Sequence, residues 1–343
     1  KDGPVGTIVY HQKTSSEPMS WSPVGNLVAG IGNDGTSLET WNALTGANAV
    51  KYRLPFQAGQ NFLMATAWSF DGTEVAFQYS NGIAVFNAQS GAVITFWNAK
   101  SNHSFQGVAF LPDGKDLVTT SFATSFTNGG TTERIGAAHL NVFSIATGQL
   151  VAQPQDKVYE NMVASPTGKY LIAGGASEAV GQGTAWDLWD TTSWSIVRTY
   201  TNVADFSWSP DGSQIALVRN GSVQIVDAQS DNVLRSFASG AGTIANIAWQ
   251  PHGTCLLVNI NNASAQTSYL SLWDTQTGAH LYTLNSYQGA FNDGSAWSSD
   301  GKYVLFSTFS MKAASTVNPA ATLTPPPTQL SVAQWDEVIW IAG

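Results

Sequence analysis

The sequence predicts an all-β chain of seven similar units, each folded as one four-stranded antiparallel sheet. Three observations lead to this fold class. A short phrase recurs seven times: usually an aromatic residue, then a small polar residue, often Pro, then Asp-Gly or a related pair. Successive copies are 41 to 54 residues apart along the whole chain, and strand-like alternation replaces helical periodicity throughout. The copies begin at Trp21, Trp68, Phe110, Ala164, Trp208, Trp249 and Trp297. We therefore expect one domain over residues 1–343.

The fifth unit shows how one repeat becomes four strands. The turn Ser209–Gly212 places Pro where φ is preset and Gly where φ is positive. Asn220-Gly221 is a strong signal for a two-residue hairpin. Around these turns lie four strand-like segments, at residues 206–208, 214–218, 222–226 and 233–237. Four antiparallel strands joined by tight turns form one blade of a propeller.

The other units divide in the same way. They predict blades near residues 19–53, 64–97, 106–153, 161–200, 205–237, 244–284 and 294–335. The last unit has three clear strands, at 295–297, 303–307 and 330–335, and its fourth is either Thr7–Tyr10 or Val338–Ile341. We favour the N-terminal strand, residues 7–10, because it closes the ring without a mismatched edge.

Several units end their third strand in an aromatic residue followed by a turn. Trp41 to Gly46 and Trp273 to Gly278 are two examples, and Trp-Asp pairs stand at Trp189, Trp273 and Trp335. In these residues the chain resembles the WD-repeat β-propellers, bacterial members in particular, over essentially its whole length. The Gly-His pair of that family is missing from most units. We therefore expect aromatic stacking between blades to carry more of the stability.

The thirteen tryptophans fit either a ligand-stacking surface or packing between blades. Trp21, Trp68, Trp208, Trp249 and Trp297 share one repeat position, which favours packing between blades. Trp97, Trp194 and Trp340 fall outside the repeat positions and are better candidates for exposure.

Composition excludes several classes of partner. Charged residues make up 11% of the chain, against roughly 25% in an average protein, and the net charge is −9 without any Lys/Arg cluster. We therefore expect no nucleic-acid partner and no anionic membrane surface. The single Cys255 excludes an intrachain disulfide and a Cys-based zinc site. No run of about 20 apolar residues is present, so we expect no direct membrane insertion within the chain.

Enzyme motifs are also absent. The sequence has no nucleophile elbow, zinc-hydrolase helix, phosphate-binding loop or calcium loop, and its five histidines do not cluster. We expect no catalytic residue, no metal and no cofactor. Propeller enzymes assemble sites from scattered residues, so a lyase or lactonase activity stays open as an alternative.

Long links between second and third strands mark one face of the predicted ring, called the top. They occur in the third, fourth, sixth and seventh units, and the third runs from Phe122 to Ala137. Loops gathered on one face of a rigid scaffold usually bind partners, although tolerated drift is the alternative. We expect a protein or peptide partner there, with these candidate contact residues: Phe126, Asn128, Glu133, Arg134, Glu178, Gln182 and Lys312.

These features together predict a non-catalytic, monomeric scaffold for protein interaction or ligand sensing. The resemblance to bacterial members implies a signalling role, as the extracytoplasmic sensor part of a larger membrane-anchored protein such as a Ser/Thr protein kinase. The charge-poor composition and the start at Lys1 fit an extracytoplasmic or cell-surface domain cut from a longer chain. A cytoplasmic location is the alternative. The alternative function is a free secreted propeller that binds a glycan or small molecule at the channel mouth.

Overall fold

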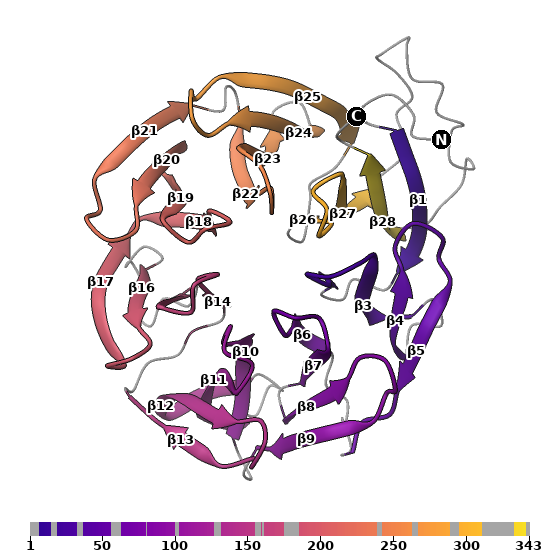
Figure 1. Cartoon of the computed structure of the whole chain (residues 1–343), viewed down its shortest axis with the longest axis vertical. Helices are drawn as coiled ribbons and strands as arrows, with labels where there is room; N and C mark the ends of the chain where they lie inside the picture. The colour runs from indigo at the N-terminus through magenta and orange to yellow at the C-terminus, as the bar shows by residue number, and fades with distance from the viewer. Residues whose placement is uncertain are drawn as a thin grey trace.

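The computed structural model describes residues 7–14, 19–32, 37–55, 63–79, 81–99, 103–126, 132–154, 159, 161–174, 185–238, 242–262, 267–288, 295–310 and 333–340. These residues form seven four-stranded sheets arranged around a ring, which we number as blades 1 to 7 (Figure 1). Among them there is no helix long and apolar enough to cross a membrane.

Every blade is antiparallel, and its strands follow one another outward from the centre of the ring. Blade 1 contains β2 (Ser20–Trp21), β3 (Leu27–Ile31), β4 (Leu38–Asn42) and β5 (Asn48–Tyr52). Blade 2 contains β6 (Leu63–Trp68), β7 (Glu74–Tyr79), β8 (Gly82–Asn87) and β9 (Val93–Asn98). Blade 3 contains β10 (His103–Phe110), β11 (Asp116–Phe126), β12 (Thr132–Ser144) and β13 (Leu150–Ala152). Blade 4 contains β14 (Asn161–Ala164), β15 (Tyr170–Gly174), β16 (Ala185–Asp190) and β17 (Ser195–Thr201).

The remaining blades follow the same order. Blade 5 contains β18 (Val203–Trp208), β19 (Gln214–Arg219), β20 (Ser222–Asp227) and β21 (Val233–Ala238). Blade 6 contains β22 (Thr243–Trp249), β23 (Cys255–Asn262), β24 (Thr267–Asp274) and β25 (His280–Gln288). Blade 7 contains β26 (Ala296–Trp297), β27 (Tyr303–Ser310), β28 (Ala333–Trp340) and β1 (Thr7–Thr14).

The turn between the first and second strands explains the repeated Ser-Pro-Asp-Gly phrase. In blade 5 the Ser209 hydroxyl donates to Asp211 Oδ1 over 2.7 Å, and the Gln214 amide donates to Ser209 Oγ over 2.9 Å. Gly212 closes the turn with a φ of 68°, in the left-handed region that favours glycine. The phrase thus supplies its own turn hydrogen bonds. These turns lie on the face opposite the turns that join second and third strands, such as Asn220-Gly221, and we call this face the bottom face.

The repeated tryptophans are buried at the blade boundaries, which confirms that prediction. All five are at most 9% exposed. The Trp68 indole donates to the Ser20 carbonyl of blade 1 over 3.1 Å, and the Trp297 indole donates to the Ala248 carbonyl of blade 6 over 2.9 Å. These side chains therefore bury a large apolar area and still satisfy their N–H groups.

The prediction that Trp97 is exposed is wrong. Trp97 is 8% exposed and packs on Phe143 of blade 3, with ring centroids 5.0 Å apart. Its indole also donates to the Gly148 carbonyl over 2.9 Å. Trp194 is partly buried, and the side chain of Trp340 lies outside the described part of the chain. The fourth strand of one blade can thus bury a tryptophan against the third strand of the next.

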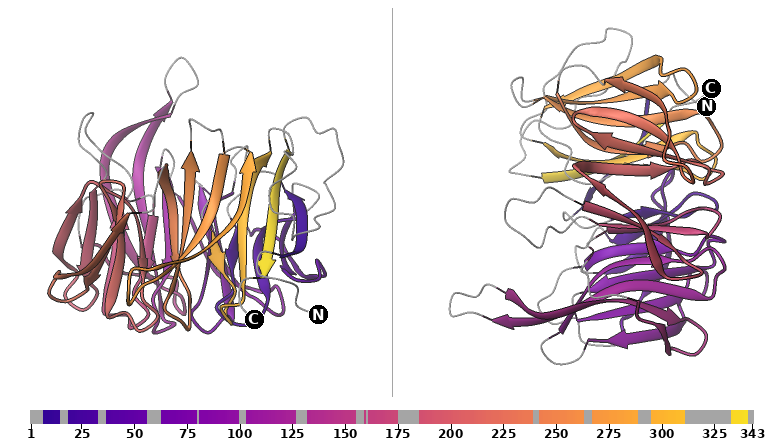
Figure 2. Two further views of the ribbon diagram at one scale, coloured as in Figure 1. Left: turned by 90° about the horizontal axis from the view of Figure 1, so that it is seen from above. Right: turned by 90° about the vertical axis from the view of Figure 1, so that its left-hand side faces the viewer.

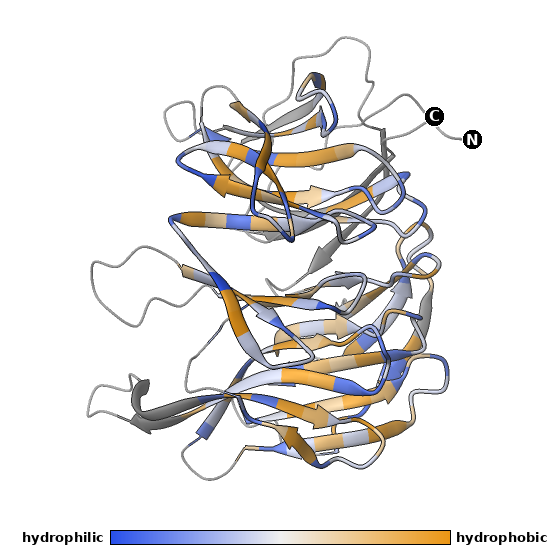
Figure 3. Ribbon diagram, turned by 60° about the vertical axis from the view of Figure 1, so that its left-hand side comes forward, coloured by the Kyte–Doolittle hydropathy of each residue, from blue (hydrophilic) through white to orange (hydrophobic). Residues whose placement is uncertain are grey.

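Apolar clusters between adjacent blades form the core. One cluster joins blades 1 and 2, where Tyr52, Phe77 and Phe86 have ring centroids 5.1 to 5.9 Å apart. In Figure 3 the hydrophobic colouring follows the strands, while many of the turns are hydrophilic. Because each blade needs its neighbour to cover its faces, the ring behaves as one domain.

The two ends of the chain meet in blade 7. β1 pairs antiparallel with β28, with Thr7 opposite Trp340. The third strand therefore runs from Ala333 to Trp340, further than the expected 330–335, and the N-terminal strand takes the fourth position. Blade 7 also contacts blade 1, because the Ser299 hydroxyl donates to the Gly25 carbonyl over 3.0 Å.

Blade 3 departs from the other blades. Its β11 and β12 are eleven and thirteen residues long, whereas the corresponding strands of blades 2 and 5 have six. The two strands pair as far as Phe126 and Thr132. The segment expected as a loop from Phe122 to Ala137 is therefore mostly an antiparallel hairpin, and Figure 2 shows it projecting from one face of the ring. The fourth strand, β13, has only three residues.

Candidate functional site

The β11–β12 hairpin is the main candidate for a docking element. The first two strands of blades 2 and 3 pair in the same register near the repeat phrase, so Ser121 on β11 corresponds to Tyr79 on β7. Tyr79 is the last residue of β7 and marks the end of the blade 2 hairpin. β11 continues for five more residues, to Phe126. At about 3.4 Å per residue, this extension places the tip roughly 17 Å beyond the end of its neighbour.

Three of the predicted contact residues lie near this tip. Along the paired strands, Phe126 is opposite Thr132, and Arg134 is opposite Thr124, with Glu133 between these pairs. The structure thus brings the backbones of Phe126, Glu133 and Arg134 together, while their side chains lie outside its description. The other four predicted residues, Asn128, Glu178, Gln182 and Lys312, lie outside the described residues altogether. Their role as partner contacts stays a prediction.

The base of the hairpin is fixed by buried polar contacts. The Thr120 hydroxyl is fully buried and lies 2.6 Å from the carbonyl oxygens of both Gln106 and Tyr159. It thereby connects blade 3 to the chain that enters blade 4. The Asn141 amide, 3% exposed as a residue, donates to Ser121 Oγ over 2.9 Å and accepts from Gln153 Nε2 over 2.8 Å. A hairpin anchored in this way presents its tip on a rigid support.

A second candidate site lies on the innermost strands of blades 5 and 6 and at Ser295, the residue before β26 of blade 7. Asp205 Oδ2 accepts hydrogen bonds from Asn246 Nδ2 over 2.8 Å and from the Ile247 amide over 2.7 Å. Asn246 Oδ1 in turn accepts from the amide and the hydroxyl of Ser295, over 2.9 and 3.0 Å. Burial raises the pKa of the Asp205 carboxyl to about 7, although these hydrogen bonds act to lower it.

The Asp205 network is better suited to joining blades than to catalysis. A carboxyl that titrates near neutral pH is a recognised mark of functional sites. Here the identified partners of Asp205 Oδ2 are protein groups, and they come from the next blade. Among the described residues, no group of three or more His, Cys, Asp or Glu side chains is placed to hold a metal ion. Our sequence reasoning missed this site, although Asp205 and Asn246 each precede a repeat tryptophan by three residues.

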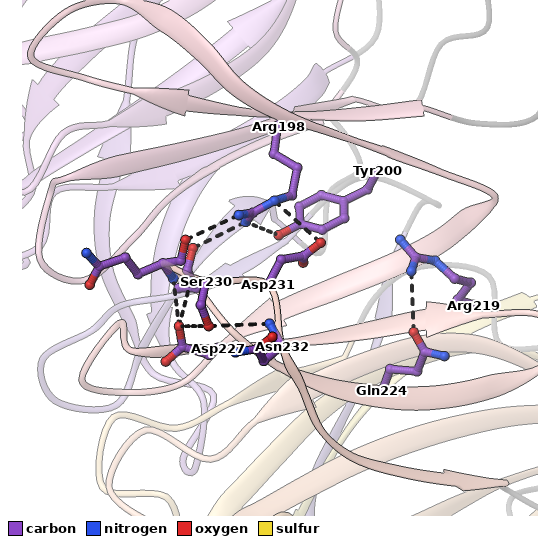
Figure 4. A network of polar contacts seen from close by, with 10 residues as sticks. Arg198, Tyr200, Arg219, Gln224, Asp227, Ser230, Asp231 and Asn232 are labelled. Carbon is purple, nitrogen blue, oxygen red and sulfur yellow. Dashed lines mark hydrogen bonds and ion pairs between the residues drawn. The ribbon is translucent and has the colours of Figure 1, made fainter.

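Arg198 fixes the outer strand of blade 4 to blade 5, as Figure 4 shows. Its guanidinium donates to the Tyr200 hydroxyl and to the Gln229 carbonyl, each over 3.2 Å, and lies 3.4 Å from Asp231 Oδ2. Burial raises the pKa of Tyr200, with the Arg198 hydrogen bond opposing, so the phenol is neutral at physiological pH. These contacts are internal to the protein, so the cluster stabilises the blade boundary.

Two clefts among the described residues lie on the bottom face. The larger has a volume of about 390 Å³ between blades 1 and 2, and its walls include Leu27, Val50, Thr73 and Gln89. The smaller, about 220 Å³, lies between blades 5 and 6 beside Leu234 and Arg235. Ligand pockets usually measure about 300–1,000 Å³ and carry a few convergent polar groups. The larger cleft is near the lower end of that range and has no charged residue in its lining.

Exposed apolar side chains gather on the outer strands. They include Val93 on β9, Val151 on β13, Val197 on β17, Val233 on β21 and Leu281 on β25, each at least 42% exposed. These residues form a discontinuous apolar rim around the ring. The rim is an alternative docking surface, with which docking at the hairpin can be compared by mutation.

Comparison with known proteins supports the fold. The family model of eukaryotic translation initiation factor eIF2A, a family of WD40-like β-propellers, matches residues 190–318. The chain is a β-propeller. This match covers fewer than half of the 343 residues and begins at the end of β16, so it bears on the fold of blades 5 to 7 above all. No curated protein matches the chain.

Proposed function

We propose that this propeller is a non-catalytic scaffold that docks a protein or peptide partner on its top face, through the blade 3 hairpin. The observation that carries the proposal is the extension of β11 and β12 beyond the hairpins of blades 2 and 5, on a base held by Thr120 and Asn141. Rigid elements that project from a scaffold position contact residues better than loops do. With a net charge of −9, the scaffold acts without nucleic acid, and we expect it to be a monomer.

The test removes the hairpin and keeps the blade. Phe122 is opposite Ala138, so joining them through Asn-Gly reproduces the two-residue turn between Arg219 and Ser222 of blade 5. We expect the wild-type chain to capture a defined partner from its native cells, and the shortened chain to capture at least tenfold less. Phe126→Ala and Arg134→Ala should each weaken capture and leave the melting temperature within about 2 °C.

A matched control separates the hairpin from the rim. Val197→Thr alters an exposed side chain on β17, in blade 4, and should leave capture unchanged. Equal capture by the wild-type and shortened chains, both folded, would refute docking through the hairpin. Loss of capture in Val197→Thr alone would move the partner to the rim.

We further propose that the propeller is the extracytoplasmic sensor part of a larger membrane-anchored protein, such as a Ser/Thr protein kinase. Two observations support this role: the resemblance to bacterial WD-repeat arrays and the low share of charged residues, 11%. The test is the intact mass and membrane fractionation of the native protein from its own cells. A larger, membrane-bound species supports the sensor role, whereas a free species near 36.4 kDa rejects it.

A further inference from the structure

We propose that Arg235, beside the cleft between blades 5 and 6, binds the carboxylate of an acidic side chain in a partner peptide. The cleft lies on the bottom face, whereas the blade 3 hairpin projects from the top, so this inference goes beyond the proposed function. It follows from a comparison of two blade boundaries that are built in the same way.

Arg198 and Arg235 occupy the same position in successive blades. Each lies on the outer strand of its blade, opposite the third-strand residue that precedes the last residue of that strand by two positions. This residue is Leu188 for Arg198 and Ile225 for Arg235. Both arginines therefore start from the same place at the boundary with the next blade.

At the boundary between blades 4 and 5, protein groups surround the guanidinium of Arg198 (Figure 4). It donates to the Tyr200 hydroxyl and to the Gln229 carbonyl, each over 3.2 Å. Its Nε also lies 3.4 Å from Asp231 Oδ2. The charge of Arg198 is thus compensated by a carboxylate from the turn of the facing blade.

Two of these partners are missing at the boundary between blades 5 and 6. Phe237 takes the strand position of Tyr200 and has no hydroxyl. Gly278 takes the turn position of Asp231, because each of these residues donates its amide to the carbonyl of the Asp four residues before it. The facing turn therefore supplies no carboxylate at this position.

Arg235 is left without an acidic partner. Its side chain is exposed, and its Nη1 donates over 3.1 Å to the Leu234 carbonyl of its own strand. Among the described residues, no carboxylate pairs with it. The single acidic residue of the facing turn, Asp274, accepts from the backbone amides of that turn instead. A cleft of about 220 Å³ remains between Arg235 and the facing residues Thr275 and Gln276.

The other boundaries show that these two positions normally match in charge. Where the strand position is uncharged, the turn position is glycine: Val50 faces Gly91, and Thr95 faces Gly148. Between blades 4 and 5 an arginine faces an aspartate. Of these four boundaries, only the one between blades 5 and 6 combines a cation with glycine. It therefore lacks one carboxylate, which a ligand can supply.

The surroundings of Arg235 indicate what carries that carboxylate. A guanidinium binds a carboxylate through two parallel hydrogen bonds, but an exposed ion pair alone contributes little. Val233 and Leu234, which are 54% and 42% exposed, add apolar contact surface next to it. The cleft is smaller than the roughly 300–1,000 Å³ of small-molecule sites, and the net charge of −9 repels a strongly acidic partner. The occupant that fits is one acidic side chain within an otherwise apolar, extended segment.

The experiment follows the Arg235 side chain directly in the intact chain. The chain contains five arginines, so isotope labelling of arginine gives few Nε–Hε signals in an NMR spectrum, and Arg235→Lys assigns the one of interest. The probe is a capped five-residue peptide with a central Glu between leucines. Its matched control has Gln in place of Glu. We expect the Glu peptide to shift the Arg235 signal and the Gln peptide to bind at least tenfold more weakly.

A second variant supplies the missing carboxylate from within. Gly278→Asp recreates the pair that Arg198 makes with Asp231, and Asp231 itself has a φ of 65°, close to the 73° of Gly278. A Cβ at Gly278 meets its nearest atom, Phe237 Cδ1, at 3.6 Å, which is an ordinary contact. We expect Gly278→Asp to weaken binding of the Glu peptide at least tenfold. Gly278→Asn has the same shape without the charge and should bind like the wild type.

Several results would overturn the inference. No shift of the Arg235 signal at millimolar Glu peptide, or equal binding of the Glu and Gln peptides, rejects a carboxylate site. Undiminished binding to a folded Arg235→Gln variant, or equal binding to Gly278→Asp and Gly278→Asn, places the peptide elsewhere. If propionate binds as tightly as the Glu peptide, the ligand is a small carboxylate and the peptide assignment fails.

These outcomes are separable from failure of the proposed function. The chain with the shortened blade 3 hairpin keeps Arg235 and its cleft, so it should bind the Glu peptide as the wild type does. If that chain still captures the partner, docking through the hairpin fails and the Arg235 site stands. If Arg235→Gln binds the Glu peptide unchanged while the shortened chain loses the partner, the reverse holds.

Discussion

Asp205 makes the stability of this propeller depend on pH in a direction opposite to that of an ordinary paired carboxylate. Burial raises the pKa of its carboxyl from 3.8 to about 7 in the folded chain. Below pH 3.8 the group is protonated in both folded and unfolded chains, so its contribution to stability is fully present. As the pH rises, the unfolded chain releases the proton first, and stability falls until the folded pKa is passed.

The size of the effect follows from the shift. About three pKa units at 1.36 kcal/mol each give about 4 kcal/mol in total, of which about 2–3 kcal/mol is lost between pH 5 and pH 8. Asp205→Asn keeps an acceptor for the Ile247 amide and cannot ionise. We expect the variant to lose little stability over this range, so its advantage over the wild type should grow by about 2–3 kcal/mol.

The assay is urea unfolding of both chains at pH 5, 6, 7 and 8, read from the transition midpoints. Asp211→Asn is the matched control, because hydrogen bonds from Ser209 and Ser213 lower the pKa of the Asp211 carboxyl. Its contribution is lost only as the pH falls below about 4, so it should not alter the slope between pH 5 and pH 8. Parallel pH profiles for wild type and Asp205→Asn would refute the reasoning and show that the carboxyl titrates normally.

Two further predictions concern packing and backbone conformation. Trp208→Ala should destabilise the fold by about 3–5 kcal/mol, since the indole is 7% exposed at a blade boundary, and a neutral result in a thermal melt would contradict this packing. Gly91→Ala should cost about 1 kcal/mol more than Gly221→Ala in chemical denaturation. Both glycines have φ values near 72°, but a Cβ at Gly91 meets Val50 Cγ1 at 2.9 Å, whereas nothing lies within 4 Å of one at Gly221. Equal costs would show that Val50 moves aside.

The blades were predictable because their signals are local. The turn Ser209–Gly212 makes its hydrogen bonds within six residues, so the sequence alone contains the whole of that structure. The repeat tryptophans were predictable for a related reason, since a fixed position in every unit implies a fixed environment. Both signals can be recognised within one unit or by comparing units, without knowing which distant residues are in contact.

Trp97 and Asp205 could not be placed in this way, because their environments come from the next blade. Trp97 is covered by Phe143 and Gly148, about 50 residues further along the chain. The Asp205 carboxyl is held by Asn246 and Ile247, about 40 residues away. Burial of a side chain at a blade boundary depends on the neighbour's register, which a single unit does not encode. Of the seven residues predicted as partner contacts on the top face, four lie outside the described residues.

The unusual length of the third unit has one structural consequence that ties the candidate site together. Its repeat phrase is 54 residues before the next copy, the longest interval in the chain. The additional residues lengthen β11 and β12, while β13 stops after three residues, with Pro154 close behind. A blade that gained residues in a loop alone would keep strands of the usual length. In blade 3 the gain and the loss coincide: among the described strands, β11 and β12 are the longest, and β13 is the shortest fourth strand. Shortening β11 and β12 together, with β13 unchanged, should therefore abolish docking while the blade stays folded.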